Sequence, residues 1–279
     1  MQETNLFDRR STRDLSRDIR LSILRTHRTA GGGHLGSSLS IVEIMAVLFH
    51  RHIRPIQPEE KTWSGDRFVL SKGHAALALY CTLESTGQIS APQLATFGKN
   101  GSALEPHPNE NLLPQVHVST GSLGQGISAA VGLALGMRLR QTGGRTFVLI
   151  GDGEANEGQV WEAARSATML GLSNLVVILD DNQMQQDGPT PDIMRMADLP
   201  ASWSAMGWAV AECNGHACNA IETALDVLLA TKGSMPKLLH ARTVKGCGVD
   251  FLENRTESHY PPALSEEELA LVQYRLQRF

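Results

Sequence analysis

A buried strand that ends in an acidic turn most constrains what this chain can fold into. The apolar run 146–150 is followed directly by Gly151-Asp152-Gly153, and a second apolar run, 174–179, leads to Asn182. Asp152 and Asn182 are 182 − 152 = 30 residues apart. Because one βαβ unit has about this length, we expect two neighbouring parallel strands that present both side chains at one edge of a sheet.

The two side chains are of the type that holds a hard divalent cation. Asp152 supplies a carboxylate oxygen and Asn182 an amide oxygen, and Mg²⁺ or Ca²⁺ prefers such ligands, with phosphate oxygens and water completing the shell. Gly151 and Gly153 leave room for phosphates to approach the backbone. The helix after this turn offers N–H groups to an anion. The pattern therefore predicts a metal-diphosphate site, although a Gly-Asp-Gly turn alone is more often only a turn.

Strands alternate with helices along most of the chain. This pattern is typical of an α/β fold with a parallel sheet and helices on both faces. We expect one domain over residues 1–279, a diphosphate-binding domain with an N-terminal helical extension. Strands are expected at 67–70, 146–150, 174–179, 208–213 and 237–243, and helices at 12–29, 40–50, 126–139, 160–170 and 217–231, with a capped amphipathic helix after Ser265.

Composition excludes several classes of partner. The net charge of −4 favours neither nucleic acid nor an acidic membrane surface, and no apolar run reaches the roughly 18 residues of a membrane span. The first residues lack the basic and apolar regions of a signal peptide, which predicts a cytoplasmic protein. The four cysteines have no paired metal-ligand spacing, so we expect reduced structural thiols at Cys81, Cys213, Cys218 and Cys247.

Two segments around the predicted site resemble a known family. Residues 151–164 (GDGEANEGQVWEAA) and 175–188 (LVVILDDNQMQQDG) resemble the thiamine diphosphate motif of transketolases. Further motifs of that family occur in the same order along the chain, with Leu35 in place of the usual proline. They are Gly32 to Ser40, Leu70 to Ala75, Pro106 to Pro108 and Ser119 to Ser128.

The resemblance implies a role for each matching residue. Asp152, Asn182 and the carbonyl of Met184 would ligate Mg²⁺ or Ca²⁺. Thiamine diphosphate would also be contacted by a second set of residues. Within it, Gly153 would present its N–H to a phosphate, and Glu157 is similar to the family's buried carboxylate that communicates between the two active sites of a dimer. Glu154 also has a simpler interpretation, as a cap for the following helix. The full set is His74, Gly121, Leu123, Gly153, Glu154, Glu157, Asn182 and Lys245.

Four histidines match catalytic positions of the family. The resemblance places His34 and His74 near the reacting carbons, His107 at the terminal hydroxyl of the donor and His259 in a C-terminal loop with Lys245. An imidazole that titrates near neutrality is suited to relaying protons to and from sugar hydroxyls. The other histidines are expected to be surface or capping residues, namely His27, His50, His52, His117, His216 and His240.

The family cleaves a ketose between C2 and C3 and passes a two-carbon ketol unit to an aldose. Its pyrimidine-binding and C-terminal domains have no counterpart in this sequence, so we expect the N-terminal subunit of a split transketolase. A C-terminal partner subunit would complete a heterotetramer. Two alternatives stay open: the α subunit of a 2-oxoacid dehydrogenase, and a non-catalytic relic that binds a partner.

Overall fold

A five-stranded parallel sheet forms the centre of the molecule, in a computed structural model that describes residues 11–54, 65–196 and 198–276. The strand order is β1-β2-β3-β5-β4, and every neighbouring pair is parallel. The predicted α/β class is therefore confirmed. The strands are β1 (Arg67–Leu70), β2 (Thr146–Gly151), β3 (Leu175–Asp181), β4 (Ala209–Asn214) and β5 (Lys237–Arg242).

The sheet is buried on both faces at its centre, where β2 and β3 are fully buried and mostly apolar. On β2, Phe147 and Leu149 belong to one hydrophobic core, whereas Val148 and Ile150 belong to another. Side chains alternate between the faces of a strand, so these are the cores on the two sides of the sheet. Unbroken apolar runs are the pattern expected of parallel strands that are covered by helices.

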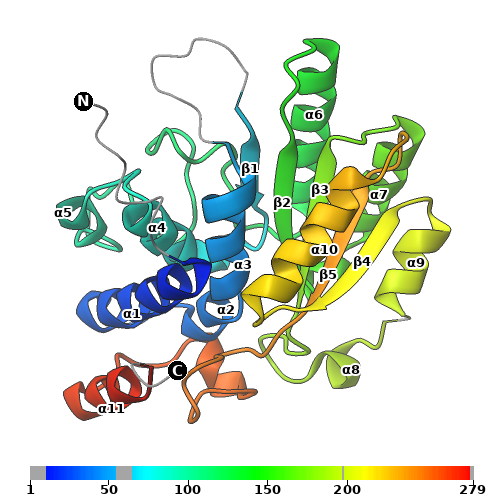
Figure 1. Cartoon of the computed structure of the whole chain (residues 1–279). Coiled ribbons are helices and arrows are strands. Elements are labelled where there is room, and N and C mark those ends of the chain that lie inside the picture. The colour runs from blue at the N-terminus through cyan, green and yellow to red at the C-terminus, as the bar shows by residue number, and fades with distance from the viewer. Residues whose placement is uncertain (1–10, 55–64, 197, 277–279) are drawn as a thin grey trace.

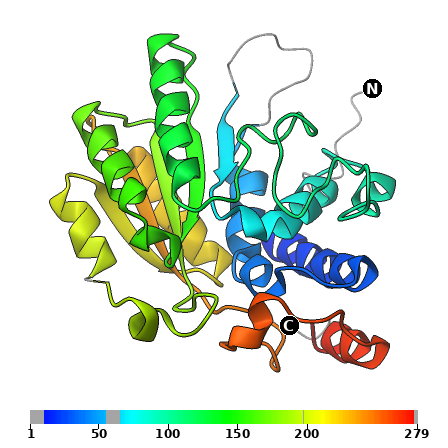
Figure 2. The same cartoon turned by 180° about the vertical axis from the view of Figure 1, so that it is seen from behind.

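Helices cover the two faces unequally (Figures 1 and 2). One face carries α6 (Gln125–Leu139), α7 (Gly158–Met169) and α9 (Leu199–Ala205). The opposite core includes α10 (Cys218–Ala230) and the N-terminal helices. These are α1 (Thr12–Ala30), α2 (Leu35–Leu39), α3 (Val42–Val47) and α4 (Ala76–Ser85), and the shorter or peripheral helices are α5 (Ala91–Leu94), α8 (Thr190–Ile193) and α11 (Glu266–Leu276).

Local signals define the ends of two predicted helices. Ser11 caps α1 by accepting a hydrogen bond from the N–H of Asp14, and Gly31 ends it in the left-handed region at φ 87°. In the predicted tail helix α11, the Ser265 hydroxyl accepts from the N–H of Glu268, whose carboxylate accepts from the N–H of Ser265. This reciprocal pair is a capping box, as expected.

The helix predicted over 40–50 is wrong in detail. It begins at Val42, changes at Leu48–His52 into a π-helical turn, and is preceded by the short helix α2, which was not predicted. Ser40 is instead the C-cap residue of α2, and its hydroxyl donates to Asp180 near the end of β3, at 2.8 Å. That partner lies 140 residues away, beyond any local pattern.

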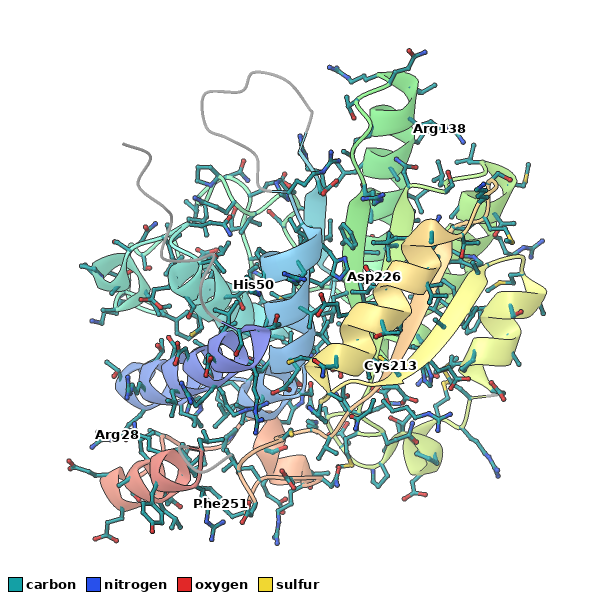
Figure 3. The ribbon with its side chains drawn as sticks, in the orientation of Figure 1. Arg28, His50, Arg138, Cys213, Asp226 and Phe251 are labelled. Atoms are coloured by element: carbon teal, nitrogen blue, oxygen red, sulfur yellow. The ribbon has the colours of Figure 1, made fainter. Side chains whose placement is uncertain are left out.

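All four cysteines are free thiols, as predicted, and Cys213 lies on β4 (Figure 3). Burial raises the pKa of Cys81 to about 12 and that of Cys213 to about 11, which makes both thiols unreactive at neutral pH. Across the described ranges, no helix combines the length and the apolar character needed to cross a membrane.

Candidate active site

The carboxyl ends of β1, β2, β3 and β5 open onto a cavity of about 500 Å³. Asp152 follows β2 and Asn182 follows the neighbouring strand β3, so the predicted pairing of adjacent parallel strands is confirmed. The cavity brings together all the site residues singled out in the sequence. Its lining includes His34, His74, His107, Gly121, Leu123, Asp152, Gly153, Glu154, Glu157, Asn182, Met184, Lys245 and His259.

Asp152 is well suited to meet a cation. Its side chain is buried, at 2% exposure, and its only hydrogen-bond donor from a described side chain is the Thr190 hydroxyl, at 2.6 Å. Burial raises the pKa of Asp152 to about 7, although the bond from Thr190 opposes this rise. A divalent cation would stabilise the charged carboxylate, so the site fits the metal that the sequence predicts.

Asn182 and Met184 form a tight turn beside Asp152. The amide oxygen of Asn182 accepts from the N–H of Met184 at 3.1 Å, and its amide nitrogen donates to Asp180 at 3.0 Å. The orientation of the amide is thus fixed, and its oxygen retains a second lone pair. The described residues contain no cluster of three or more His, Cys, Asp or Glu side chains suited to a metal. The predicted ligands are instead one carboxylate, one amide oxygen and one carbonyl oxygen, and the oxygens of a diphosphate would complete the coordination shell of the metal.

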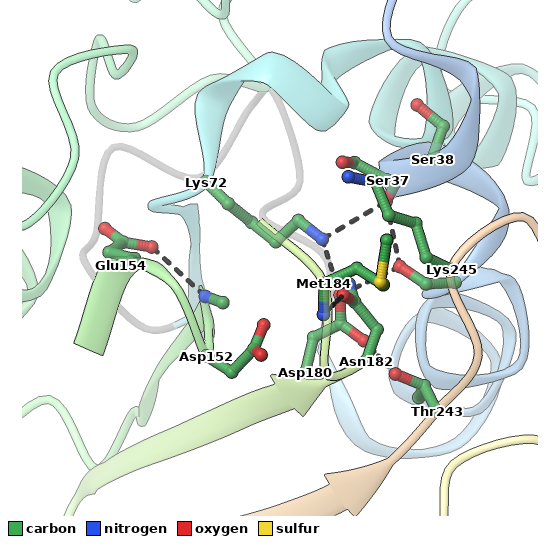
Figure 4. A network of polar contacts seen from close by, with 12 residues as sticks. Ser37, Ser38, Lys72, Asp152, Glu154, Asp180, Asn182, Met184, Thr243 and Lys245 are labelled. Atoms are coloured by element: carbon green, nitrogen blue, oxygen red, sulfur yellow. Dashed lines mark hydrogen bonds and ion pairs between the residues drawn. The ribbon is translucent and has the colours of Figure 1, made fainter. Parts of the chain in front are cut away.

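A buried ion pair that sequence reasoning missed lies beneath these ligands (Figure 4). Lys72 Nζ donates to Asp180 at 2.5 Å and to the carbonyl of Ser37 at 3.2 Å. Asp180 also accepts from Ser40, Thr243 and Asn182. Burial opposes ionisation of Asp180, but Lys72 and these donors outweigh it and lower its pKa. Two signals were present: a lysine two residues after an apolar strand, and an aspartate next to the end of another.

Glu154 connects three loops around the cavity. Its carboxylate accepts from the Ser71 hydroxyl at 2.5 Å and from the N–H groups of Gly124 and Gly151 at 2.8 and 3.2 Å. Burial raises the pKa of Glu154. The interpretation of Glu154 as a helix cap is wrong, because α7 begins after Glu157 and the Glu154 carboxylate has tertiary partners instead.

Glu157 and Gly121 form part of the rim. Glu157 is exposed in the single chain, so the buried environment that the resemblance implies is not provided by the residues described. Gly121 has φ 155°, and a Cβ there would lie 3.1 Å from the His107 ring. Glycine therefore permits the close approach of this loop to His107. Leu123 adds an apolar contact to the same wall of the cavity.

Four histidines from four separate segments meet in this cavity. The ring centroid of His34 lies 5.4 Å from that of His74, 5.8 Å from that of His107 and 5.0 Å from that of His259. The rings of His74 and His259 are 5.6 Å apart. His34 precedes α2, His74 follows β1, His107 lies in an irregular stretch and His259 ends a 3₁₀ turn at Thr256–His259.

Close backbone packing places His259 beside His34. A Cβ on Gly36 would lie 2.5 Å from the Ser258 hydroxyl, so only glycine allows these two segments to touch. The N–H of Gly246 donates to the carbonyl of Gly36 at 3.0 Å. Gly32 and Pro262 also form an antiparallel bridge. The C-terminal segment is therefore attached to the loop that carries His34.

The pKa values of the four histidines in the cavity are all lowered, so these rings are neutral at physiological pH. Burial, with smaller effects from His107 and Lys245, lowers the pKa of His34 to about 4. Burial and Lys245 lower the pKa of His259 to about 4 as well. Burial also lowers the pKa of Lys245, to about 8, and its amine lies 2.8 Å from the carbonyl of Gln185 and 3.2 Å from His259. Neutral imidazoles can accept protons, whereas Lys245 can hold an anion.

Two of the remaining histidines are not the surface residues that were expected. His27 is fully buried, and His240 is buried with its Nε2 2.7 Å from Asp181. Both belong to elements whose burial is decided by packing: His27 lies in the last turn of α1 and His240 within β5. The sequence around each histidine does not show which other segments pack against it, so the burial of these two rings was not predicted.

The family comparison agrees with this arrangement. Residues 11–277 match the family model described as transketolase, thiamine diphosphate binding domain. A relative from Phocaeicola vulgatus, named as one subunit of an apulose-4-phosphate transketolase, is 37% identical over 85% of this chain and 84% of its own. Another, from Clostridium sp. (strain MSTE9), is named as one subunit of a 6-deoxy-6-sulfo-D-fructose transketolase. It is 39% identical over 82% of this chain and 83% of its own.

Solved structures of transketolases have the same fold. Transketolase from Leishmania mexicana matches with a TM-score of 0.89 and 30% identity, over 96% of this chain and 41% of that chain. The match therefore spans about two fifths of that transketolase. This chain belongs to the transketolase family and carries its thiamine diphosphate-binding domain.

Proposed function

We propose that this chain is the N-terminal subunit of a two-chain transketolase that moves a two-carbon ketol unit from a ketose to an aldose. Residues 1–279 would be its single diphosphate-binding domain. One observation carries the proposal: a metal-diphosphate ligand set and four neutral histidines line the same cavity. A metal site alone would suit many enzymes, but several proton acceptors around one cavity suit a substrate rich in hydroxyl groups.

The diphosphate end of the cofactor would lie over the ends of β2 and β3. Asp152, Asn182 and the carbonyl of Met184 would hold Mg²⁺ or Ca²⁺ there. Gly153 would donate its N–H to a phosphate, and Lys245 would add a positive charge nearby. Lys72 and Asp180 keep this edge in place, since the pair is fully enclosed and connects β1 to β3.

The histidines would manage protons around the sugar. Bound thiamine diphosphate supplies the carbanion chemistry that cleaves and forms the bond next to the ketone. His34, His74 and His259 are neutral and converge, so they can remove a proton from a substrate hydroxyl during cleavage and return it in the reverse direction. His107 would hydrogen-bond a terminal hydroxyl of the donor.

A second chain is part of the proposal. Relatives that match over most of their length are named as subunits, which supports a partner subunit that completes the enzyme. That C-terminal subunit would supply the pyrimidine-binding domain and its glutamate, in a cytoplasmic heterotetramer. The exposed carboxylate of Glu157 would then be covered at an interface between subunits.

Reconstitution tests the proposal. The chain is mixed with its C-terminal subunit, Mg²⁺ and thiamine diphosphate, and ketol transfer is followed from hydroxypyruvate to an aldose. We expect transfer by the mixture and little by either chain alone. Full activity of this chain alone would contradict the partner requirement, and decarboxylation of pyruvate without ketol transfer would favour the 2-oxoacid dehydrogenase alternative.

The variant Asp152→Asn tests directly whether Asp152 is a metal ligand. This variant keeps the size of the side chain but removes the only carboxylate of the predicted ligand set. Since loss of an outer-shell partner already costs about 10–100-fold in metal affinity, we expect a loss of more than about 100-fold here. Calorimetric titration of the two-chain complex with Mg²⁺ and thiamine diphosphate measures it, and unchanged affinity would rule out Asp152 as a ligand.

A further inference from the structure

An exposed tyrosine stands at the rim of the histidine cluster. The Tyr260 side chain is 66% exposed, yet its ring centroid lies only 5.0 Å from that of His34, with the two rings nearly perpendicular at 85°. His34 contacts His74, His107 and His259 on its other sides. Tyr260 thus extends the wall of imidazole rings outward, beyond the residues that line the cavity.

The backbone holds Tyr260 in this position although its side chain faces outward. Pro262, two residues further along the chain, forms an antiparallel bridge with Gly32, and a Cβ on Gly32 would lie 3.7 Å from the carbonyl oxygen of Pro261. Prolines restrict the chain on the C-terminal side of the ring. The loop carrying His34 and the segment carrying Tyr260 are therefore attached to each other on the side next to the cavity.

Core packing does not explain this ring. A tyrosine that is two-thirds exposed contributes little to burial, and the contact it makes is with a histidine of the proposed active site. Tyrosine combines an apolar ring with a hydroxyl that both donates and accepts hydrogen bonds. Aromatic rings with a few polar groups are the usual lining of small-molecule sites.

We propose that Tyr260 is a specificity-determining residue that contacts the part of the sugar beyond the reacting bond. The proposal rests on the proposed ketol transfer. The histidines surround the reacting carbons, so a sugar chain longer than two or three carbons leaves the cavity past His34 and meets Tyr260. The ring packs against its carbon chain, and the hydroxyl bonds one of its hydroxyl groups.

The experiment varies the length of the acceptor and keeps the donor constant. Hydroxypyruvate is the donor: the bond between its carboxylate carbon C1 and its keto carbon C2 breaks, CO₂ leaves, and the two-carbon unit of C2 and C3 bonds to the aldehyde carbon of the acceptor, whose oxygen takes up one proton. The two-chain enzyme is assayed with glycolaldehyde, which has two carbons, and with D-ribose, which has five. For Tyr260→Ala we expect kcat/KM to fall about tenfold with ribose and less than about twofold with glycolaldehyde.

Two further variants distinguish the contribution of the Tyr260 ring to kcat/KM from that of its hydroxyl, and from the effect of removing any exposed side chain. Tyr260→Phe keeps the ring, so an intermediate loss with ribose assigns the remainder to the hydroxyl. Leu271→Ala is the control, because Leu271 is an exposed apolar side chain on α11. This variant should leave kcat/KM unchanged with both acceptors.

Three results would overturn the role of Tyr260. These are equal losses with both acceptors, no loss with either, and weaker association of the two chains in sedimentation with the acceptor preference unchanged. The last result would mean that the partner subunit covers the ring. Absence of transfer from hydroxypyruvate to glycolaldehyde by the unmodified complex would instead contradict the proposed function itself.

Discussion

The two halves of the candidate site are built in opposite ways. In the diphosphate half, Lys72, Glu154, Asp180 and Asn182 are buried and hydrogen-bonded to one another or to the backbone. In the histidine half, the rings of His34, His74 and His107 have no hydrogen-bond partner among the residues that the structure describes, and His259 bonds only Lys245.

This difference separates two tasks. Hydrogen bonds within the protein hold these four side chains in place, so their positions are set by the folded structure before any ligand binds. The ring nitrogens of the histidine half are free to bond a substrate. We therefore expect changes in the first half to lower the stability of the fold, and changes in the second to lower activity alone.

Lys72→Met should give the largest effect on stability. It removes the cation beside Asp180 and leaves a buried carboxylate without its ion-pair partner, which costs about 3–5 kcal/mol. Urea unfolding of the isolated chain measures the loss. The double variant Lys72→Met with Asp180→Asn should recover much of it, because no charge is then left buried.

A surface ion pair provides the matched control. Arg51 and Glu222 are 2.8 Å apart, but the Arg51 side chain is 54% exposed. Arg51→Met should therefore lower the free energy of unfolding by less than about 1 kcal/mol. Equal losses for Lys72→Met and Arg51→Met would contradict the view that the diphosphate half is part of the core.

The next effect is a dependence of stability on pH. The pKa of Asp152 is about 7 in the folded chain, above its ordinary 3.8, so the folded state binds this proton more tightly than the unfolded state. The stabilisation is complete below about pH 4 and is lost as the pH rises towards 7. From the size of the shift, the loss is at most about 4 kcal/mol.

The Asp152→Asn variant isolates this titration. His34 and His259, with pKa values of about 4, titrate in the same range with the opposite sign, but they are present in both proteins. Without metal, the stability of the wild type relative to Asp152→Asn should fall between pH 4 and 7, and bound metal should remove the slope. A constant difference would show that Asp152 has an ordinary pKa.

His34→Gln should have the smallest effect on the fold and act on catalysis instead. General acid–base residues contribute about 10²–10⁴-fold, so we expect kcat of the two-chain enzyme to fall at least about 100-fold. The free energy of unfolding should change by less than about 0.5 kcal/mol. A large loss in the free energy of unfolding would show that His34 stabilises the fold as the residues of the diphosphate half do, and would contradict the difference between the two halves.

Much of the fold was predictable because it depends on short-range patterns. Apolar runs located all five strands, with the prediction for β1 matching the observed bounds, and small residues and caps located α6 and α11. The role of Ser40 was not predictable, because its hydroxyl donates to Asp180, 140 residues further along the chain. A local sequence pattern contains no information about a partner so far along the chain.

The sequence by itself determined the chemistry that the site contains: a carboxylate and an amide one βαβ unit apart, and histidines within recognisable motifs. Only the tertiary structure decided how these groups are used. It paired Lys72 with Asp180 across 108 residues and left the rings of His34, His74 and His107 in the cavity without hydrogen-bond partners among the described residues. The ring of His259 bonds only Lys245. The physical reason is that spacing along the chain sets which strand end a side chain occupies, whereas its charge and its hydrogen-bond partners depend on what the packed fold places beside it.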